Sequence, residues 1–246
     1  MSDEILAHTE HRTWPVPRDP WILFQSWHDL LFAHWPLPVE LLRPLVPAAL
    51  PIEEFDGSAW IGVIPFRIEH FGPRLVPELP GLSEFHELNV RTYVRVADRP
   101  GVFFFSLDAA SLMAVYGARM FYGLPYFHAR MSSERDDGWI HYRSRRQQGR
   151  PAEFAGRYRA VGGEFVAAAG TLEYWLTERY CLYTAHGSGR ATRVDIHHLP
   201  WTLQRAEATI EVNTMPPDGL ELPDSEPVLH YAQAQDVLTW APRFAD

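Results

Sequence analysis

The chain has 246 residues, 46% of them hydrophobic, which is enough for one large domain with a buried core. Its net charge of −9 argues against a nucleic-acid partner, because binding a phosphate backbone requires a basic surface. The sequence contains no lysine, so all 22 basic residues are arginine. A lysine Schiff base is therefore excluded from the chemistry of this protein.

The sequence also bears on the cellular compartment. Its N-terminal residues lack the basic and apolar segments of a signal peptide, and no apolar run is long enough to cross a membrane, so we expect a cytoplasmic protein without a membrane partner. Cys181 is the only cysteine and lies in the apolar run Y-C-L-Y. We expect its thiol to be buried and unreactive.

The first third of the chain alternates between strand-like and proline-rich segments. Residues 1–20 are polar and interrupted by prolines, which predicts an extended arm ahead of a single domain, residues 21–246. Aromatic and apolar runs predict strands, and prolines bound a short helix. The expected elements are a strand over 21–35, a helix over 38–46, a strand over 59–68 and a loop over 72–83.

Residues 87–96 alternate between polar and apolar side chains, which predicts a strand with two unlike faces. The polar face carries Glu87, Asn89, Arg91, Tyr93 and Arg95. Such a face usually points to solvent. If the sheet closes into a barrel, however, Glu87, Arg91 and Tyr93 form a buried polar cluster. There the pKa of Glu87 can be tuned for acid–base chemistry and Arg91 can bind a carboxylate.

The remaining segments are mostly short strands. One helix is expected at 109–122, ended by Gly123 and Pro125. The R-S-R-R cluster, residues 143–146, is expected on a solvated loop. Strands are expected at 101–108, 139–144, 206–212 and 228–240, with a hairpin of 176–184 and 190–198 around H-G-S-G. Together these predict a β-rich α+β fold with few helices and a closed or strongly curved sheet.

Other candidate motifs are weaker. His197 and His198 are adjacent in an expected strand and face opposite ways, and no Cys/His spacing completes a ligand set, so we expect no metal. Residues T-E-R-Y, 177–180, form an ion pair at an element boundary or supply Glu178 or Arg179 to a pocket. No Walker, dinucleotide or G-x-S-x-G motif occurs, and we expect no cofactor.

Several runs resemble the YqjF-like proteins, an uncharacterised bacterial family. They are W-H-D-L-L-F-A-H-W, F-H-E-L-N-V-R-T-Y-V, L-P-Y, L-T-E-R-Y-C-L-Y and I-H-H-L-P-W, spread over most of residues 20–240. More distantly, the order of elements and two short motifs resemble the acetoacetate decarboxylase superfamily. That resemblance implies a cone-like barrel around a pocket, in a homo-oligomer.

The superfamily resemblance also implies site residues. The run F-H-E matches an aromatic-x-Glu strand and places Glu87 in the site, while G-L-P-Y-F matches the segment that carries the imine-forming lysine. Tyr126 stands at that lysine position, Phe127 replaces its charged neighbour, and His28 falls where the family has an arginine on its first strand. Imine-based decarboxylation is therefore excluded.

Three readings of the function remain open. The first is a lyase, hydratase or isomerase that acts on a small keto or hydroxy acid with Glu87 and Tyr126 as catalytic residues. The second is a non-catalytic binder of an apolar or lipid-like ligand in the same cavity. The third is a structural protein whose polar cluster satisfies itself. In the first reading the expected substrate-binding residues are Arg91, His28, Tyr93, Arg119 and Phe127.

Overall fold

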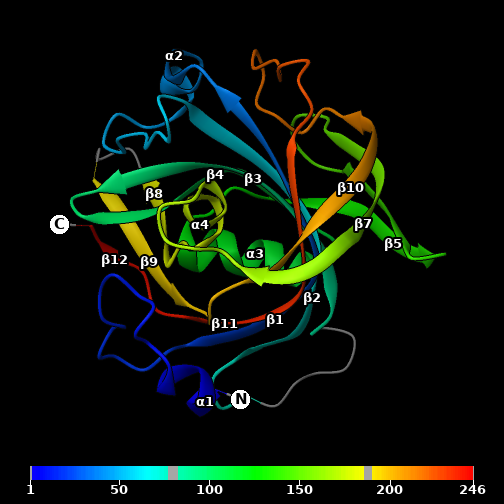
Figure 1. Ribbon diagram of the computed structural model, residues 1–246. Helices are drawn as coiled ribbons and strands as arrows, with labels where there is room; N and C mark the ends of the chain where they lie inside the picture. Colours follow the sequence, from blue (N-terminus) through cyan, green and yellow to red (C-terminus); the bar gives the residue numbers. More distant parts are fainter. Residues whose placement is uncertain (1, 77–82, 186–189, 246) are drawn as a thin grey trace.

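Strands make up most of the fold in the computed structural model, which describes residues 2–76, 83–185 and 190–245 (Figure 1). The helices are α1 (Ser2–Ala7), α2 (Val39–Leu42), the 3-10 turn η1 (Arg43–Leu45), α3 (Leu112–Tyr122) and α4 (Leu172–Thr177). The strands are β1 (Leu23–Leu37), β2 (Ala59–Pro73), β3 (Phe85–Val96), β4 (Arg99–Ala109), β5 (Tyr126–Asp136), β6 (Trp139–Arg146), β7 (Glu153–Val166), β8 (Cys181–Ala185), β9 (Ala191–His197), β10 (Thr202–Asn213), β11 (Val228–Thr239) and β12 (Arg243–Phe244).

The described strands form one sheet that closes on itself twice. The sheet order is β12-β9-β8-β4-β3-β2-β1-β11-β10-β7-β6-β5. Pairing of β4 with β5 closes a nine-stranded barrel that runs from β4 through β1 and β11 to β5. Pairing of β9 with β11 closes a smaller ring that shares β1 to β4 and β11. The predicted β-rich α+β fold with a curved, closed sheet is confirmed.

The shared strands are buried on both faces because each face points into a different ring. Leu88 and Val90 of β3 join the core of the nine-stranded barrel, with Leu31 of β1 and Val63 of β2. The opposite face of the same strands contributes a second core that includes Phe32. This double burial explains the long apolar runs of the sequence. It also places the polar face of β3 inside the smaller ring.

A β-bulge in β1 changes which side chains face the smaller ring. Asp29 has a positive φ of 57°, and the register between β1 and β2 shifts between His28 and Ala33. Asp tolerates this left-handed conformation better than most residues. The alternation therefore reverses at the bulge: Trp27 faces the inside before it, and Leu30 faces the inside after it.

The N-terminal arm differs from the prediction. Residues 2–7 form helix α1, and Ile5 is buried against Trp240. The Arg12 guanidinium donates to the Ile196 carbonyl at 2.7 Å, and Trp14 is buried against Tyr180. The prediction of an extended arm was wrong here because these side chains have partners on β9 and its neighbours, which no local pattern reveals.

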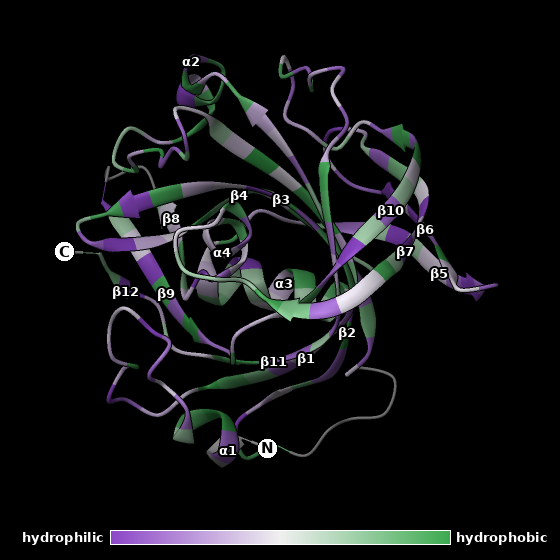
Figure 2. Ribbon diagram, viewed as in Figure 1, coloured by the Kyte–Doolittle hydropathy of each residue, from purple (hydrophilic) through white to green (hydrophobic). Residues whose placement is uncertain are grey.

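Three further segments depart from the prediction. The basic cluster lies at the end of strand β6 rather than on a solvated loop, and Arg146 is buried there against Asp108. Strands β5 and β7 and helix α4 were not predicted. The outer ends of β5 and β6 extend away from the ring, and Figure 2 shows them largely hydrophilic. The H-G-S-G turn and part of the 72–83 loop lie outside the described residues.

Candidate functional site

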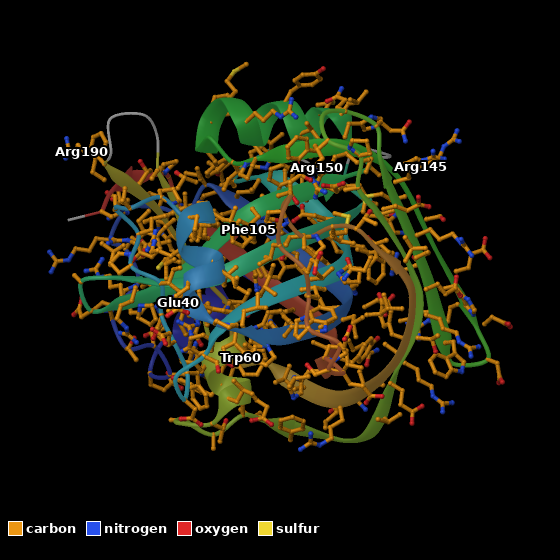
Figure 3. All side chains as sticks on the ribbon, turned by 90° about the horizontal axis from the view of Figure 1, so that it is seen from above. Glu40, Trp60, Phe105, Arg145, Arg150 and Arg190 are labelled. Atoms are coloured by element: carbon orange, nitrogen blue, oxygen red, sulfur yellow. The ribbon has the colours of Figure 1, made fainter. Side chains whose placement is uncertain are left out.

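A cavity of about 770 Å³ occupies the smaller ring. Helix α3 covers one end of it and the C-terminal end of α4 closes the other. Figure 3 shows the two helices on opposite sides of the barrel, α3 in green and α4 in yellow-green near Trp60. Most of the lining is aromatic or aliphatic, which is usual for a small-molecule site. The apolar lining includes Trp27, Leu30, Phe32, Ile64, Phe66, Phe85, Phe104 and Trp201.

Helix α3 leaves the cavity accessible at its own end. The Ser111 side chain caps its N-terminus and Gly123, with a φ of 63°, ends it in the left-handed conformation. Met113 and Phe121 line the cavity and are also exposed to solvent. Apolar surface therefore continues from the outer face of α3 into the cavity.

Glu87 and Tyr126 form a hydrogen-bonded pair in the cavity wall. The Tyr126 hydroxyl donates to Glu87 Oε2 at 2.9 Å, and only 4% of Glu87 is exposed. Burial raises the pKa of the Glu87 carboxyl to about 8; the charge of Asp108 acts in the same direction and the Tyr126 hydrogen bond opposes it. Burial, and then the charge of Glu87, raises the pKa of Tyr126 well above 10. Glu87 is therefore mostly protonated at neutral pH, and Tyr126 remains a hydrogen-bond donor.

The pair is brought together by the join of β3, β4 and β5. Glu87 lies on β3 opposite Ala109 of β4, and Tyr126 opens β5, where it pairs with Leu107. Gly123 turns the chain out of α3 into β5. The segment G-L-P-Y-F is thus cavity wall at Tyr126, as the sequence predicted.

Arg91 lies on the same face of β3, four residues beyond Glu87. Its Nη2 donates to the Leu176 carbonyl at 3.1 Å and its Nε to the Tyr93 hydroxyl at 3.3 Å. Only 8% of the residue is exposed, and within residues 2–76, 83–185 and 190–245 it forms no ion pair. A buried cation without a carboxylate partner is costly, so this position suits an anionic ligand.

Arg179 lies beside Arg91 and also lines the cavity. Its Nη1 lies 2.5 Å from Glu53 Oε2, and its Nε donates to the Trp175 carbonyl at 2.6 Å. Its Nη2 is buried and has no hydrogen-bond partner among the described residues. Glu53 pairs with both Arg179 and the more exposed Arg95, and no described carboxylate pairs with Arg91, so this end of the cavity is positively charged. Of the segment T-E-R-Y, Arg179 both forms an ion pair and lines the cavity. Glu178 does not line the cavity and instead accepts hydrogen bonds from Tyr180 and the Trp201 backbone.

Three of the proposed substrate-binding residues lie behind the cavity wall. Tyr93 is buried under Trp175, and its hydroxyl contacts Arg91, His34 Nε2 at 2.6 Å and the Leu176 carbonyl at 3.0 Å. It therefore positions Arg91. Arg119 is on the outer side of α3 and donates to the Tyr126 carbonyl at 2.7 Å. Phe127 points away from the cavity and packs under the Arg146 guanidinium, 4.1 Å from the ring centroid.

His28 also lies outside the cavity lining. Its Nε2 is 3.0 Å from Ser26 Oγ and 3.5 Å from Glu69. Simple alternation from Leu30 would turn His28 inward, but the bulge at Asp29 turns it outward. The structure thus places His28, Tyr93, Arg119 and Phe127 outside the residues that line the cavity.

Two cavity residues were not proposed from the sequence. Asn89 lies between Glu87 and Arg91 on the polar face of β3, so the alternation that identified its neighbours also identifies it. His198 lines the cavity near Arg179, with Nε2 3.3 Å from the Arg179 carbonyl. Burial lowers the pKa of His198 to about 4, so its ring is neutral at neutral pH. Its cavity position follows from tertiary packing, and no sequence signal reveals it.

The described part of the chain contains no group of three or more metal-ligating side chains, and none of its helices is long and apolar enough to cross a membrane. Cys181 is buried as predicted, and burial raises the pKa of its thiol to about 12.

The fold is shared with acetoacetate decarboxylase-like proteins. The enduracididine biosynthesis enzyme MppR complexed with pyruvate superimposes with a TM-score of 0.66 at 12% identity, covering 96% of this chain and 93% of that one. An acetoacetate decarboxylase-like enzyme from Sphingomonas wittichii RW1 gives a TM-score of 0.65 at 15% identity, with 96% and 98% coverage. Acetoacetate decarboxylase from Legionella pneumophila gives 0.62 at 11% identity, with 95% and 93% coverage. At these identities the comparison establishes the fold alone.

The chain belongs to the family DUF2071, described as an uncharacterized conserved protein, whose model matches residues 24–236. It is 49% identical over 226 residues to the uncharacterized protein YqjF of Bacillus subtilis (strain 168), which covers 92% of this chain and 93% of that protein. The resemblance to YqjF-like proteins is confirmed.

Proposed function

We propose that this protein is an enzyme of lyase, hydratase or isomerase type that binds an oxygenated organic acid and moves a proton with Glu87 and Tyr126. The observation that carries the proposal is the Glu87–Tyr126 pair. The carboxyl has a pKa near 8, lies 2.9 Å from the phenol oxygen and borders an apolar cavity. An acid or base with a pKa near the working pH is the most effective proton-transfer group.

The chemistry follows from the protonation states. In its ionised form Glu87 takes a proton from the carbon next to a substrate carbonyl, and the electron pair of that C–H bond passes to the carbonyl oxygen. Tyr126 turns its hydroxyl from Glu87 to that oxygen and stabilises the negative charge. Return of a proton to carbon completes an isomerisation, and loss of a leaving group completes an elimination. No step uses an imine, since the sequence has no lysine.

The second candidate is a non-catalytic binding protein for an apolar or lipid-like ligand. The specific observation in its favour is the lining, which is dominated by aromatic and aliphatic side chains over a volume of about 770 Å³. Both candidates use the same cavity. Only the first needs the raised pKa of Glu87.

Arg91→Met tests whether the cavity holds an organic acid. We expect keto or hydroxy acids to raise the melting temperature of the native protein and Arg91→Met to weaken that binding at least 30-fold, since losing one partner of a buried charge pair costs about 2 kcal/mol or more. The readout is a thermal-shift panel of keto acids, hydroxy acids, aldehydes and fatty acids. Arg159→Met is the matched control, because Arg159 pairs with Glu207 at the surface and does not line the cavity. Equal binding by Arg91→Met and the native protein would contradict the proposed anion site.

A further inference from the structure

The two polar poles of the cavity lie far apart along β3. Glu87, Asn89 and Arg91 face the cavity at alternate positions of one strand. A strand rises about 3.3 Å per residue, so the Cα atoms of Glu87 and Arg91 are roughly 13 Å apart. Glu87 bonds to Tyr126, which follows α3 in the chain, and Arg91 bonds to Leu176 of α4. Figure 3 shows these two helices on opposite sides of the barrel.

The pole at the α4 end is built for one carboxylate. The Arg91 and Arg179 guanidinium carbons lie 5.6 and 4.9 Å from the centroid of the same Tyr93 ring. Both guanidinium groups are also held by backbone carbonyls, because Arg91 donates to Leu176 and Arg179 donates to the preceding residue, Trp175. Glu53 pairs with Arg179 and is shared with Arg95, so it does not neutralise Arg91. Arg179 Nη2 is a buried donor without a partner among the described residues. A single carboxylate supplies both the missing charge and the missing acceptor.

Asn89 marks a third polar position between the poles. Only 6% of the residue is exposed, and its Oδ1 is buried without a hydrogen-bond partner in the described chain. A buried amide oxygen needs a donor. A hydroxyl group both donates and accepts, so it satisfies the amide in either orientation.

We propose that the substrate is a medium-chain oxo monocarboxylate whose carbonyl lies about eight to twelve bonds from its carboxylate, with a hydroxyl between them. An extended chain advances about 3.5 Å for every three backbone bonds, so about eleven bonds are needed to cover 13 Å. This inference rests on the proposed function, since Glu87 and Tyr126 act on the carbonyl. An acid of the size of pyruvate, with adjacent carboxylate and carbonyl, cannot contact both poles at once.

A length series measured by isothermal titration calorimetry tests the inference. The probes are pyruvate, 4-oxopentanoate and 9-oxodecanoate, together with decanoate and 2-decanone, which each lack one polar group. We expect 9-oxodecanoate to bind at least tenfold more tightly than either shorter oxo acid. Arg91→Met should weaken 9-oxodecanoate at least 30-fold and leave 2-decanone unchanged, and Arg159→Met should change neither.

Asn89 is tested in the same way with 5-hydroxydecanoate and decanoate. We expect the hydroxy acid to bind at least fivefold more tightly to the native protein, and Asn89→Leu to remove that preference while decanoate binding is retained. Retention of the preference in Asn89→Leu would overturn the hydroxyl assignment.

The outcomes separate this inference from the proposed function. Binding of pyruvate or 4-oxopentanoate as tight as that of 9-oxodecanoate, and weakened by Tyr126→Phe, would overturn the length assignment and leave the proposed acid–base chemistry uncontradicted. If Tyr126→Phe leaves the preference for 9-oxodecanoate over decanoate unchanged, the carbonyl does not meet the Glu87–Tyr126 pair, and both the proposed function and this inference are contradicted. Absence of binding by every probe would overturn the length assignment as well.

Discussion

Glu87→Gln is expected to remove a large pH dependence from the stability of this protein. Burial raises the pKa of Glu87 from 4.5 to about 8 in the folded state, so the folded state holds this proton more tightly than the unfolded chain does. The stability that this proton contributes is fully present below pH 4.5, falls as the pH rises and is lost above pH 8. At about 1.36 kcal/mol per pKa unit, the loss is on the order of 5 kcal/mol.

Urea unfolding at pH 4.5, 7 and 9 measures this effect. As the pH rises, the unfolding free energy of the native protein should fall relative to that of Glu87→Gln. The reason is that the glutamine stays neutral at every pH and keeps the hydrogen bond from Tyr126. Glu84→Gln, at an exposed position three residues earlier, serves as the control. Parallel pH profiles for Glu87→Gln and the native protein would show that Glu87 titrates as an ordinary surface carboxyl.

Asp108→Asn is expected to destabilise the fold by about 3–5 kcal/mol, because it leaves the Arg146 cation buried without its partner. Arg146 Nε lies 3.0 Å from both oxygens of Asp108, and Nη2 lies 2.5 Å from one of them. Both side chains are almost fully buried. The pair joins β4 to β6, and Phe127 beneath it pairs with Asp108 in the β4–β5 ladder. The ion pair therefore supports the strand that begins with Tyr126.

Urea unfolding at pH 7 is again the measurement, with Asp218→Asn as the matched control. Asp218 pairs with Arg150 at 3.2 Å but is exposed, so its loss should cost less than about 1 kcal/mol. The double variant Asp108→Leu/Arg146→Met should recover most of the stability, since it removes both charges together. A cost of Asp108→Asn below 1 kcal/mol would mean that the pair is not desolvated as its burial indicates.

The sequence groups the polar side chains of β3 on one face because the pairing of β3 with β2 is regular from Phe85 to Thr92, although its pairing with β4 shifts between Val90 and Arg91. Period-two alternation then decides the face of each side chain, and it correctly grouped Glu87, Asn89 and Arg91. The resemblance of G-L-P-Y-F to a family motif located Tyr126. Neither signal depends on contacts between distant segments.

The failures arise where long-range structure overrides the local pattern. His28 faces away because one extra residue at Asp29 reverses the alternation of β1. Tyr93 is on the correct face, but Trp175 of the unpredicted helix α4 covers it, with ring centroids 4.6 Å apart. Arg146 was placed on a loop because its charge suggests exposure, yet Asp108, thirty-eight residues earlier, pairs with it in the interior. Partners of this kind are set by the topology of the sheet.

The central claim is that Glu87 transfers a proton to and from a bound oxo acid. Loss of the hydrogens next to the carbonyl of 4-oxopentanoate and 9-oxodecanoate in D₂O, followed by proton NMR, tests it most directly. We expect exchange that is catalysed by the native protein, rises with pH through about 8 as Glu87 ionises, and is reduced to the uncatalysed rate by Glu87→Gln. Exchange at the same rate with Glu87→Gln, or no catalysed exchange with either acid, would contradict it.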